Sequence, residues 1–314
     1  MTKPEHLTIA EPSDVSNPYG LGCASINGRF VPMAEATIPI MDAGFVRSDL
    51  TYDVVGVWEG KFFRLEDHLD RLMRGCERIR LEPPVSRDEI RTTLIECVRR
   101  SGLRESYVEA IVTRGVPPRG ERDPRRFGAR FYAYAVPYIW IARPEQQVDG
   151  IDIAVARDTI RIPVGAVDPT VKNFHWADLT RALFEAYDRD AWLPVLTDGN
   201  GNITEGTGCN VVAVVDGQVR TPGRGVLEGI TRRTVLEIAA ELGYETVVDF
   251  FPVSDLYRAT EILMVSTAGG VMPVRSLDGK PVGEGRPGPV TQQLRDRYWE
   301  LHDDDRYSTV VDYG

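Results

Sequence analysis

The first half of the chain combines short alternating apolar segments with two helical patterns. One amphipathic helix is predicted from apolar residues spaced at Leu65, Leu69, Leu72, Cys76 and Ile79. A second is predicted from Ile90 to Arg100, because Ser86 and Glu89 form a capping box before it and Gly102 follows it. The predicted strands are Cys23–Phe30 and Ala36–Ile40 around the Asn27-Gly28 turn, Thr51–Trp58 and Lys61–Arg64 around Glu59-Gly60, Tyr107–Thr113, and Arg130–Val136.

The second half mixes strands and helices in an irregular order. Helices are predicted at Trp176–Asp188, Thr231–Leu242 and Pro289–Leu301, and strands at Ile151–Ala156, Pro194–Thr197, Asn210–Val215, Gln218–Thr221, Glu245–Phe250 and Glu261–Ser266. Because this order is not a clean βαβ alternation, it favours two α+β domains over a doubly wound sheet. We predict an N-terminal domain over 1–136, a linker over 137–150 and a C-terminal domain over 151–314.

Composition points to small-molecule chemistry inside a cell. The 314 residues carry 37 basic and 47 acidic side chains, and the net charge of −10 argues against a broad electrostatic hold on nucleic acid. Four scattered cysteines without a Cys-x-x-Cys pair favour a reducing, cytoplasmic setting, and the four histidines lack metal-ligand spacing. The polar segment Met1 to Asn17 has no apolar core, and no stretch is long enough to span a membrane. We therefore predict no metal and no membrane partner.

Lys172 is the candidate for the chemistry. It is the only lysine between Lys61 and Lys280 in a chain that otherwise prefers arginine. By composition alone a single lysine is usually solvated surface. Its interpretation changes because three motifs that suit phosphate and ring binding follow it along the chain.

In the first motif, Gly225 to Arg232, a glycine-bearing loop leads into a helix, where the N–H groups of Ile230 and Thr231 could hold a dianion. The alternative is a plain capped helix that binds no anion. The second, Ser266-Thr267-Ala268-Gly269-Gly270, follows an apolar strand and could close another side of an anion cup. The third, Thr204 to Val211, places Glu205 before a glycine-rich turn, either as a surface carboxylate or as the partner of a ring nitrogen.

Together these motifs resemble the fold-type IV pyridoxal-phosphate enzymes, which include branched-chain and D-amino-acid aminotransferases, (R)-selective amine transaminases and aminodeoxychorismate lyase. The resemblance covers about Cys23 to Tyr313 and includes H-L-D-R-L at His68 to Leu72, which is similar to the family's N-terminal phosphate motif. The segments S-D-L-T-Y-D-V-V, F-F-R-L-E-D-H-L and D-P-T-V-K-N are most similar to (R)-selective amine:pyruvate transaminases.

The resemblance implies a role for each matching residue. Lys172 would be the Schiff-base lysine and proton shuttle, and Glu205 would keep the pyridine nitrogen protonated. Arginine could not replace Lys172, because a guanidinium stays protonated at neutral pH. Leu227 would pack on the ring face, and the phosphate would be held by Arg71, Ile230, Thr231 and Thr267.

The implied substrate pocket is lined by Tyr52, Val54, Tyr107 and Trp176, with a loop arginine for the carboxylate of a keto acid. Arg119 is the expected arginine, although Arg122, Arg125 and Arg126 lie in the same polar loop, Gly115 to Arg126. Two positions depart from the (R)-amine transaminase pattern: Arg47 replaces a histidine and Tyr107 a phenylalanine. Arg47 could bind a substrate carboxylate and favour D-amino acids, or it could face solvent.

These observations predict a transaminase that works by a ping-pong mechanism, from an (R)-amine or D-amino acid to pyruvate or 2-oxoglutarate. The expected architecture is two α+β domains with pyridoxal 5′-phosphate between them, in a homodimer. A branched-chain L-amino-acid aminotransferase, a pyridoxal-phosphate lyase of the aminodeoxychorismate lyase type, and a binding protein that has lost turnover remain as alternatives.

Overall fold

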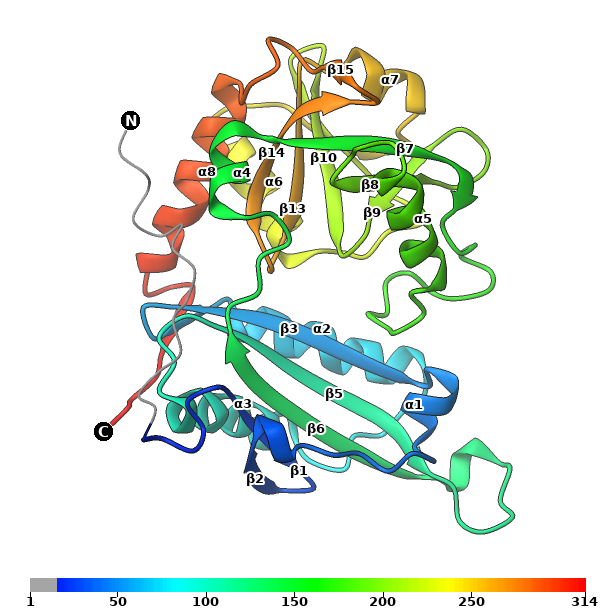
Figure 1. Cartoon of the computed structure of the whole chain (residues 1–314), viewed down its shortest axis with the longest axis vertical. Coiled ribbons are helices and arrows are strands. Elements are labelled where there is room, and N and C mark those ends of the chain that lie inside the picture. Colours follow the sequence, from blue (N-terminus) through cyan, green and yellow to red (C-terminus); the bar gives the residue numbers. More distant parts are fainter. Residues whose placement is uncertain (1–15) are drawn as a thin grey trace. The chain divides into compact units, whose positions relative to one another are not determined.

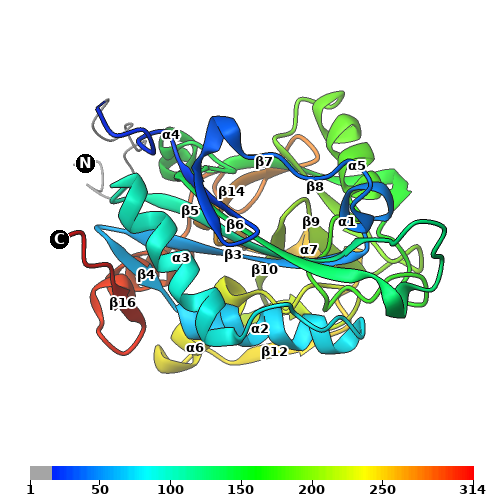
Figure 2. The same ribbon diagram turned by 90° about the horizontal axis from the view of Figure 1, so that it is seen from below.

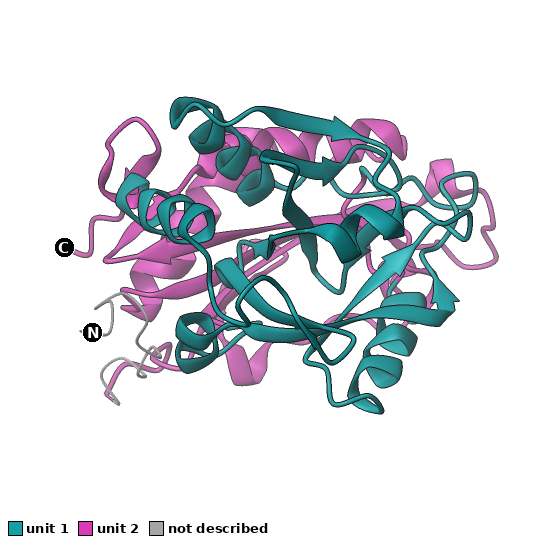
Figure 3. Ribbon diagram, turned by 90° about the horizontal axis from the view of Figure 1, so that it is seen from above, with its two compact units in different colours: residues 1–8, 140–170, 176–301 teal, residues 9–139, 171–175, 302–314 magenta. Residues whose placement is uncertain are grey.

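The computed structural model describes residues 16–314, which form two compact units (Figure 3). The N-terminal unit contains the described residues up to 139, together with 171–175 and 302–314. The C-terminal unit contains 140–170 and 176–301. The prediction made for the segment Met1 to Asn17 lies, up to residue 15, outside the described residues. Within residues 16–314, no helix is long and apolar enough to cross a membrane.

The N-terminal unit is built on a seven-stranded antiparallel sheet with the order β16-β4-β3-β5-β6-β1-β2 (Figure 1). Its strands are β1 (Cys23–Ile26), β2 (Arg29–Pro32), β3 (Leu50–Trp58), β4 (Lys61–Phe63), β5 (Ser106–Val116), β6 (Gly128–Pro137) and β16 (Ser308–Val310). Helices α2 (Leu65–Arg78) and α3 (Arg87–Ser101) cover one face of this sheet (Figure 2). The unit also contains the short helix α1 (Ala43–Arg47) and 3₁₀ turns at Met33–Glu35 and Pro124–Arg126.

Local sequence signals account for the two long helices of this unit. The predicted apolar stripe of α2 is buried at Leu65, Leu69, Leu72 and Cys76. Helix α3 begins with the predicted capping box, since Ser86 accepts from the N–H of Glu89 and the Glu89 side chain accepts from Ser86 N. The helix ends at Gly102, whose φ of 72° is the left-handed conformation that glycine adopts without strain.

The predicted strand over Ala36–Ile40 is wrong. This segment is irregular and leads into α1, and the side chains of Ile38 and Ile40 are exposed. The hairpin at Asn27-Gly28 instead joins β1 to β2, which ends at Pro32. Apolar residues at 36–40 satisfied a strand pattern locally, but no neighbouring strand among the described residues offers this segment a ladder of hydrogen bonds.

The C-terminal unit contains a nine-stranded mixed sheet, ordered β12-β11-β10-β13-β14-β7-β8-β9, with β15 paired to β14. Because β9 also pairs with β10, six of these strands close into a ring. The strands are β7 (Ile151–Ile160), β8 (Leu193–Thr197), β9 (Ile203–Gly206), β10 (Cys209–Val215), β11 (Gln218–Pro222), β12 (Thr246–Asp249), β13 (Glu261–Ser266), β14 (Gly270–Leu277) and β15 (Lys280–Pro281). The helices are α4 (Pro144–Asp149), α5 (Ala177–Tyr187), α6 (Ile230–Glu241), α7 (Val253–Arg258) and α8 (Pro289–Glu300).

The compact units differ from the predicted domain boundaries in two respects. Residues 171–175 and 302–314 join the N-terminal unit, because Tyr52 N donates to Lys172 O and β16 pairs with β4. The segment expected to be a linker, 137–150, contains α4, which belongs to the C-terminal unit. Both differences arise from pairings between residues far apart in the sequence.

Candidate active site

In the C-terminal unit, the carboxylate of Glu205 is held from several sides at the end of β9. Arg161 Nε donates to Glu205 Oε1 at 2.9 Å, and Leu227 N donates to Oε2 at 2.9 Å. Asn210, opposite Glu205 in the β9–β10 pair, places its amide nitrogen 3.5 Å from Oε2. Glu205 is therefore a buried, fixed carboxylate and not the exposed turn residue that the sequence left as an alternative.

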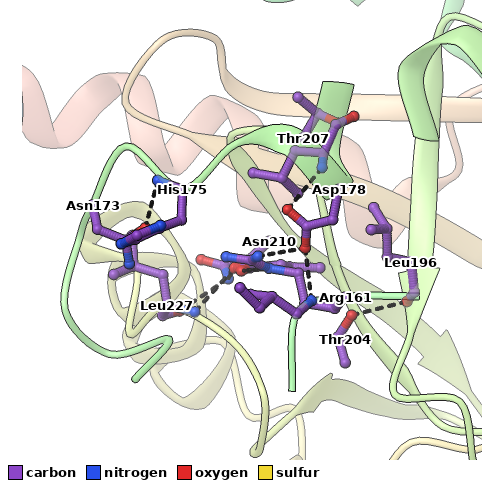
Figure 4. A network of polar contacts seen from close by, with 12 residues as sticks. Arg161, Asn173, His175, Asp178, Leu196, Thr204, Thr207, Asn210 and Leu227 are labelled. Atoms are coloured by element: carbon purple, nitrogen blue, oxygen red, sulfur yellow. Dashed lines mark hydrogen bonds and ion pairs between the residues drawn. The ribbon is translucent and has the colours of Figure 1, made fainter. Parts of the chain in front are cut away.

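Arg161 is a site residue that the sequence analysis missed. It follows β7 directly and is buried. It also donates to Oδ2 of Asp178, a residue in the first turn of α5, over a distance of 2.7 Å (Figure 4). Burial alone would lower the pKa of Arg161, but Glu205 and Asp178 outweigh it and leave the pKa raised. The arginine therefore stays charged between two carboxylates. Its only sequence signal was a charge placed between Ile160 and Ile162 at the end of an apolar strand.

The start of helix α6 has the features of an anion site. The first residues of a helix have N–H groups without intrahelical acceptors, and here these residues are Ile230 and Thr231, both buried. The loop before them is fixed because Asn210 Nδ2 donates to Leu227 O at 3.0 Å (Figure 4). A Cβ on Gly229 would lie 2.1 Å from Asn210 Oδ1, so only glycine allows this close approach.

The Ser266–Gly270 turn lies at the same end of the sheet as this loop. Asn210 near the start of β10 pairs with Val265 near the end of the antiparallel β13, and Ser266 Oγ donates to Gly208 O at 2.8 Å. Thr267, half-buried, follows in this turn. The structure thus brings Glu205, Leu227, the α6 start and Thr267 together within one unit. Trp176, just before α5, lies against Gly208, where a Cβ would be 3.4 Å from the indole.

In the N-terminal unit, hydrogen bonds to the backbone carbonyl of Lys172 fix the position of this residue. The Lys172 carbonyl accepts from Tyr52 N at 3.1 Å and from Thr51 Oγ1 at 3.0 Å, so the lysine is tied to β3. Its Nζ lies 4.5 Å from the centroid of the Tyr52 ring, and the Phe174 ring packs on Tyr52 at a centroid distance of 4.5 Å. The turn is closed by His175 N, which donates to Asn173 Oδ1 at 2.9 Å (Figure 4). Lys172 is half-buried rather than fully solvated.

Arg71 on α2 belongs to a buried polar triad. Its Nε and Nη2 donate to Asp53 Oδ2 and Oδ1 at 2.7 and 2.8 Å, and His68 Nδ1 lies 2.7 Å from Asp53 Oδ1. Burial alone would raise the pKa of Asp53, but Arg71 and His68 outweigh it and lower that pKa far below its usual range. Burial lowers the pKa of His68, which keeps the imidazole neutral at neutral pH, with Nδ1–H donating to the carboxylate. The triad fixes the orientation of the Arg71 guanidinium.

The face of the sheet opposite α2 and α3 carries three of the four predicted pocket residues, whereas Trp176 belongs to the C-terminal unit. Tyr52 and Val54 on β3 cluster with Tyr107 on β5, and their role as a pocket wall stays a prediction. Glu109, which pairs with Val54 across the β3–β5 ladder, lies on this face as well and was missed. It is buried and accepts from the Tyr134 hydroxyl at 2.6 Å. A single charge inside the apolar strand Tyr107–Thr113 was its signal in the sequence.

The arginines predicted to meet a carboxylate lie on exposed segments. Arg47, at the end of α1, is exposed and its Cζ lies 5.7 Å from the Phe127 ring centroid. In the loop between β5 and β6, Arg125 and Arg126 form ion pairs with Asp123 and Glu121 at 2.6 and 3.3 Å. The side chains of Arg119 and Arg122, in the same loop, make no ion pair with any of the residues 16–314. Of the four loop arginines, these two are the better candidates to reach a ligand.

Comparison with known proteins identifies the family. The model of the amino-transferase class IV family matches residues 50–277. The chain is 30% identical over 288 residues to a branched-chain-amino-acid aminotransferase of Pseudomonas aeruginosa, covering 88% of this chain and 91% of that protein. It is 29% identical over 278 residues to a D-alanine aminotransferase of Listeria monocytogenes, covering 88% and 94%.

The fold gives the same result. The branched-chain amino acid aminotransferase of Thermobaculum terrenum, in its pyridoxal-phosphate form, superposes with a TM-score of 0.83 at 27% identity, covering 92% of this chain and 98% of that one. These similarities extend over both units, and the range matched by the family model contains Lys172, Glu205 and the start of α6. The chain therefore belongs to the amino-transferase class IV family and is a pyridoxal-phosphate-dependent aminotransferase of fold type IV.

Proposed function

We propose that the enzyme transfers the amino group of an (R)-amine or D-amino acid to a keto acid such as pyruvate or 2-oxoglutarate. The observation that most supports this proposal is the position of Lys172 Nζ, 4.5 Å from the Tyr52 ring, on a face that also carries Val54 and Tyr107. Aromatic and aliphatic side chains beside the reacting amine suit a donor with apolar substituents.

Residues of the C-terminal unit fit the cofactor. The N–H groups at the start of α6 and the Thr231 and Thr267 hydroxyls form a donor set that suits a phosphate dianion, and Gly229 leaves the loop close to Asn210. Glu205, fixed by Arg161 and Leu227, would face the pyridine nitrogen, and Leu227 would cover the ring. Arg71 is proposed as a further phosphate ligand on the family resemblance alone.

Lys172 would carry out both covalent attachment and proton transfer. When bound, pyridoxal phosphate supplies an electron sink for the carbon that loses its proton. Lys172 Nζ would take the proton from that carbon and return it elsewhere, which requires an amine that can lose its own proton. The hydrogen bonds from Tyr52 and Thr51 to the Lys172 carbonyl would hold the base of the side chain still during these transfers.

In the second half-reaction a keto acid would be the acceptor, and its carboxylate would need a cation. Arg119, the arginine that the family resemblance implies, is our candidate. Its side chain, like that of Arg122, makes no ion pair with the described residues, whereas Arg125 and Arg126 are already paired. Trp176 would complete the pocket. Arg47, exposed beside Phe127, would contribute only from the pocket mouth.

A homodimer is part of the proposal. Supporting it is a run of exposed apolar side chains near α1, consisting of Ile38, Ile40, Met41, Phe45 and Val46. Phe45→Asp should weaken self-association in sedimentation experiments, whereas Phe184→Asp, equally exposed at 64% on α5, should not. A wild-type monomer at micromolar concentration would contradict the proposal.

The structural neighbours favour a second candidate, a branched-chain L-amino-acid aminotransferase, because the Thermobaculum terrenum protein compared above is named as one. Steady-state rates with L-leucine, D-alanine and (R)-1-phenylethylamine separate the candidates. We expect D-alanine or the (R)-amine to be the best donor, and dominant L-leucine activity would overturn our choice.

The role of Lys172 has its own test. Lys172→Ala and Lys172→Arg should both abolish turnover and the visible absorbance band that borohydride bleaches, because neither side chain can form the covalent bond. Lys280→Ala, at an exposed lysine on β15, is the matched control and should keep both. Full turnover in Lys172→Ala would exclude this lysine.

A further inference from the structure

Gln147 on α4 is a fully buried amide beside the Ser266–Gly270 turn of the C-terminal unit. It is 0% exposed, and its Nε2 donates to Gly269 O at 2.8 Å and to Ala142 O at 3.4 Å. Because both neighbours are carbonyl oxygens, only the amide nitrogen can face them. The Oε1 atom has no hydrogen-bond partner among residues 16–314.

Glutamine is an unusual residue at this position. Burying a polar atom without a hydrogen bond is unfavourable. Pro144, three residues earlier on α4, is buried as well, so position 147 faces the core, where leucine or methionine would leave no side-chain atom unsatisfied. What glutamine provides, and an apolar side chain does not, is a donor to the Gly269 carbonyl.

Two donors hold successive carbonyl groups of this turn. Ile141 N donates to Ala268 O at 2.7 Å, and the next carbonyl along the chain, that of Gly269, accepts from Gln147. Helix α4 is itself held in place, because Arg295 Nη1 on α8 donates to Gln147 O at 3.0 Å. The segment that enters the C-terminal unit therefore fixes the direction of both carbonyl groups.

The direction of these peptide groups decides whether the turn can bind an anion. A backbone N–H attracts an anion, whereas a carbonyl oxygen repels it. Because residues 16–314 contain no cis peptide bond, the N–H of Gly269 points away from the Ala268 carbonyl of the same peptide. Glycine lacks the Cβ that restricts other residues, so the peptide between Gly269 and Gly270 could turn over and reverse its carbonyl. The hydrogen bond from Gln147 opposes that rotation.

We propose that Gln147 is a positioning residue for the cofactor phosphate. It holds the Gly269 carbonyl away from the anion, so that the turn offers N–H groups and the Thr267 hydroxyl to the phosphate. This inference rests on the proposed cofactor site, in which Thr267 contacts the phosphate. Gln147 acts through the turn, and its expected contribution is that of one neutral hydrogen bond, about fivefold in affinity.

Two forms of the cofactor isolate the phosphate. Pyridoxal 5′-phosphate and pyridoxal differ only in that group, and equilibrium dialysis with the full-length chain freed of cofactor gives both dissociation constants. Gln147→Met keeps a similar volume but removes the donor, so it should weaken pyridoxal 5′-phosphate binding about fivefold and leave pyridoxal binding unchanged. The phosphorus NMR resonance of the bound phosphate should also shift, because its hydrogen bonds change.

Ser101→Ala is the matched control. Ser101 is 0% exposed and its hydroxyl donates to Val98 O at 2.8 Å, the same length as the bond from Gln147, but it lies at the end of α3 in the N-terminal unit. This variant should lose stability in urea without a change in either dissociation constant or in the phosphorus resonance. If Gln147→Met behaves in the same way, Gln147 serves only the stability of the fold and the inference is overturned.

Thr267→Val separates the inference from the site on which it rests. If Thr267→Val selectively weakens binding of the phosphate form and Gln147→Met does not, the inference is overturned and the proposed site stands. If neither variant changes the preference for the phosphate form, both fail. Equal weakening of both ligands by Gln147→Met also overturns the inference. If Gln147→Met does not fold, Gln147→Asn, which draws the amide back by one methylene, must show the selective loss instead, and its absence overturns the inference.

Discussion

Replacing Arg161 with methionine should destabilise the protein far more than breaking a comparable pair on its surface. The Arg161 side chain is 7% exposed and bonds to Glu205 at 2.9 Å and Asp178 at 2.7 Å, whose side chains are 8% and 15% exposed. Methionine fills much of the space of the arginine stem but cannot pair with either acid. The substitution leaves one buried and one partly buried carboxylate without their shared cation.

The size of the stability loss depends on the hydrogen bonds that the Glu205 and Asp178 carboxylates still accept in the variant. Removing one partner of a buried ion pair costs about 3–5 kcal/mol. Glu205 retains the N–H of Leu227, and Asp178 retains the N–H of Ile162 at 2.7 Å, so both keep a hydrogen-bond donor. We therefore expect a loss near the lower limit, about 3 kcal/mol, or about 1 M in the urea midpoint for a slope of about 3 kcal/mol/M.

Urea unfolding followed by circular dichroism provides the measurement. The matched control is Arg275→Met, because Arg275 bonds to Asp152 at 2.7 Å but the two side chains are 47% and 31% exposed. That variant should lose no more than about 1 kcal/mol. The loss in Arg161→Met should shrink from pH 8 to pH 5, because protons neutralise the uncompensated carboxylates in the folded protein. Adding Asp178→Asn to Arg161→Met should restore part of the stability.

Two results would refute this reasoning. One is a loss in Arg161→Met that is no larger than in Arg275→Met, which would mean that burial of the pair has no energetic consequence. The other is a large loss that does not change with pH, which would assign the effect to packing around the arginine stem rather than to the charges of Glu205 and Asp178.

Three further substitutions test separate parts of the structure. Gly229→Ala should weaken cofactor binding at least about tenfold in equilibrium dialysis, because the added Cβ would displace Asn210 and overpacking costs about 1–3 kcal/mol. The control Gly165→Ala should leave cofactor binding unchanged, because the space around Gly165 is open. Asp53→Asn should lower stability by about 3–5 kcal/mol at pH 7. In chemical denaturation this difference should begin to shrink as the pH falls below about 4, the pKa of an unfolded aspartate, and should keep shrinking toward the much lower pKa of the folded carboxyl, since the lowered pKa of Asp53 stabilises the fold only while the carboxylate is charged. Ser86→Ala should cost about 1 kcal/mol of thermal stability by removing the capping box of α3.

Several elements could be predicted because the interactions that form them are local. The apolar stripe of α2, the Ser86 capping box and the stop at Gly102 depend on residues within a few turns of one helix. The order of motifs from Lys172 onward was enough for the family, which the comparisons confirm. Helices α1, α4 and α7 and strands β9, β14, β15 and β16 were not predicted, because their sequences are short or weakly patterned.

The α+β class, the family and the residues that carry its motifs all follow from the order of residues along the chain. The pairing of charged groups within each unit became visible only in three dimensions: Arg161 with Glu205 and Asp178, Arg71 with Asp53, and Glu109 with the hydroxyl of Tyr134. Side-chain periodicity predicts whether a residue faces the core. It does not predict which distant residue that side chain contacts, because strand register and sheet order depend on the whole unit. For that reason the buried carboxylate of Glu109 was visible in the sequence only as one charge inside an apolar strand.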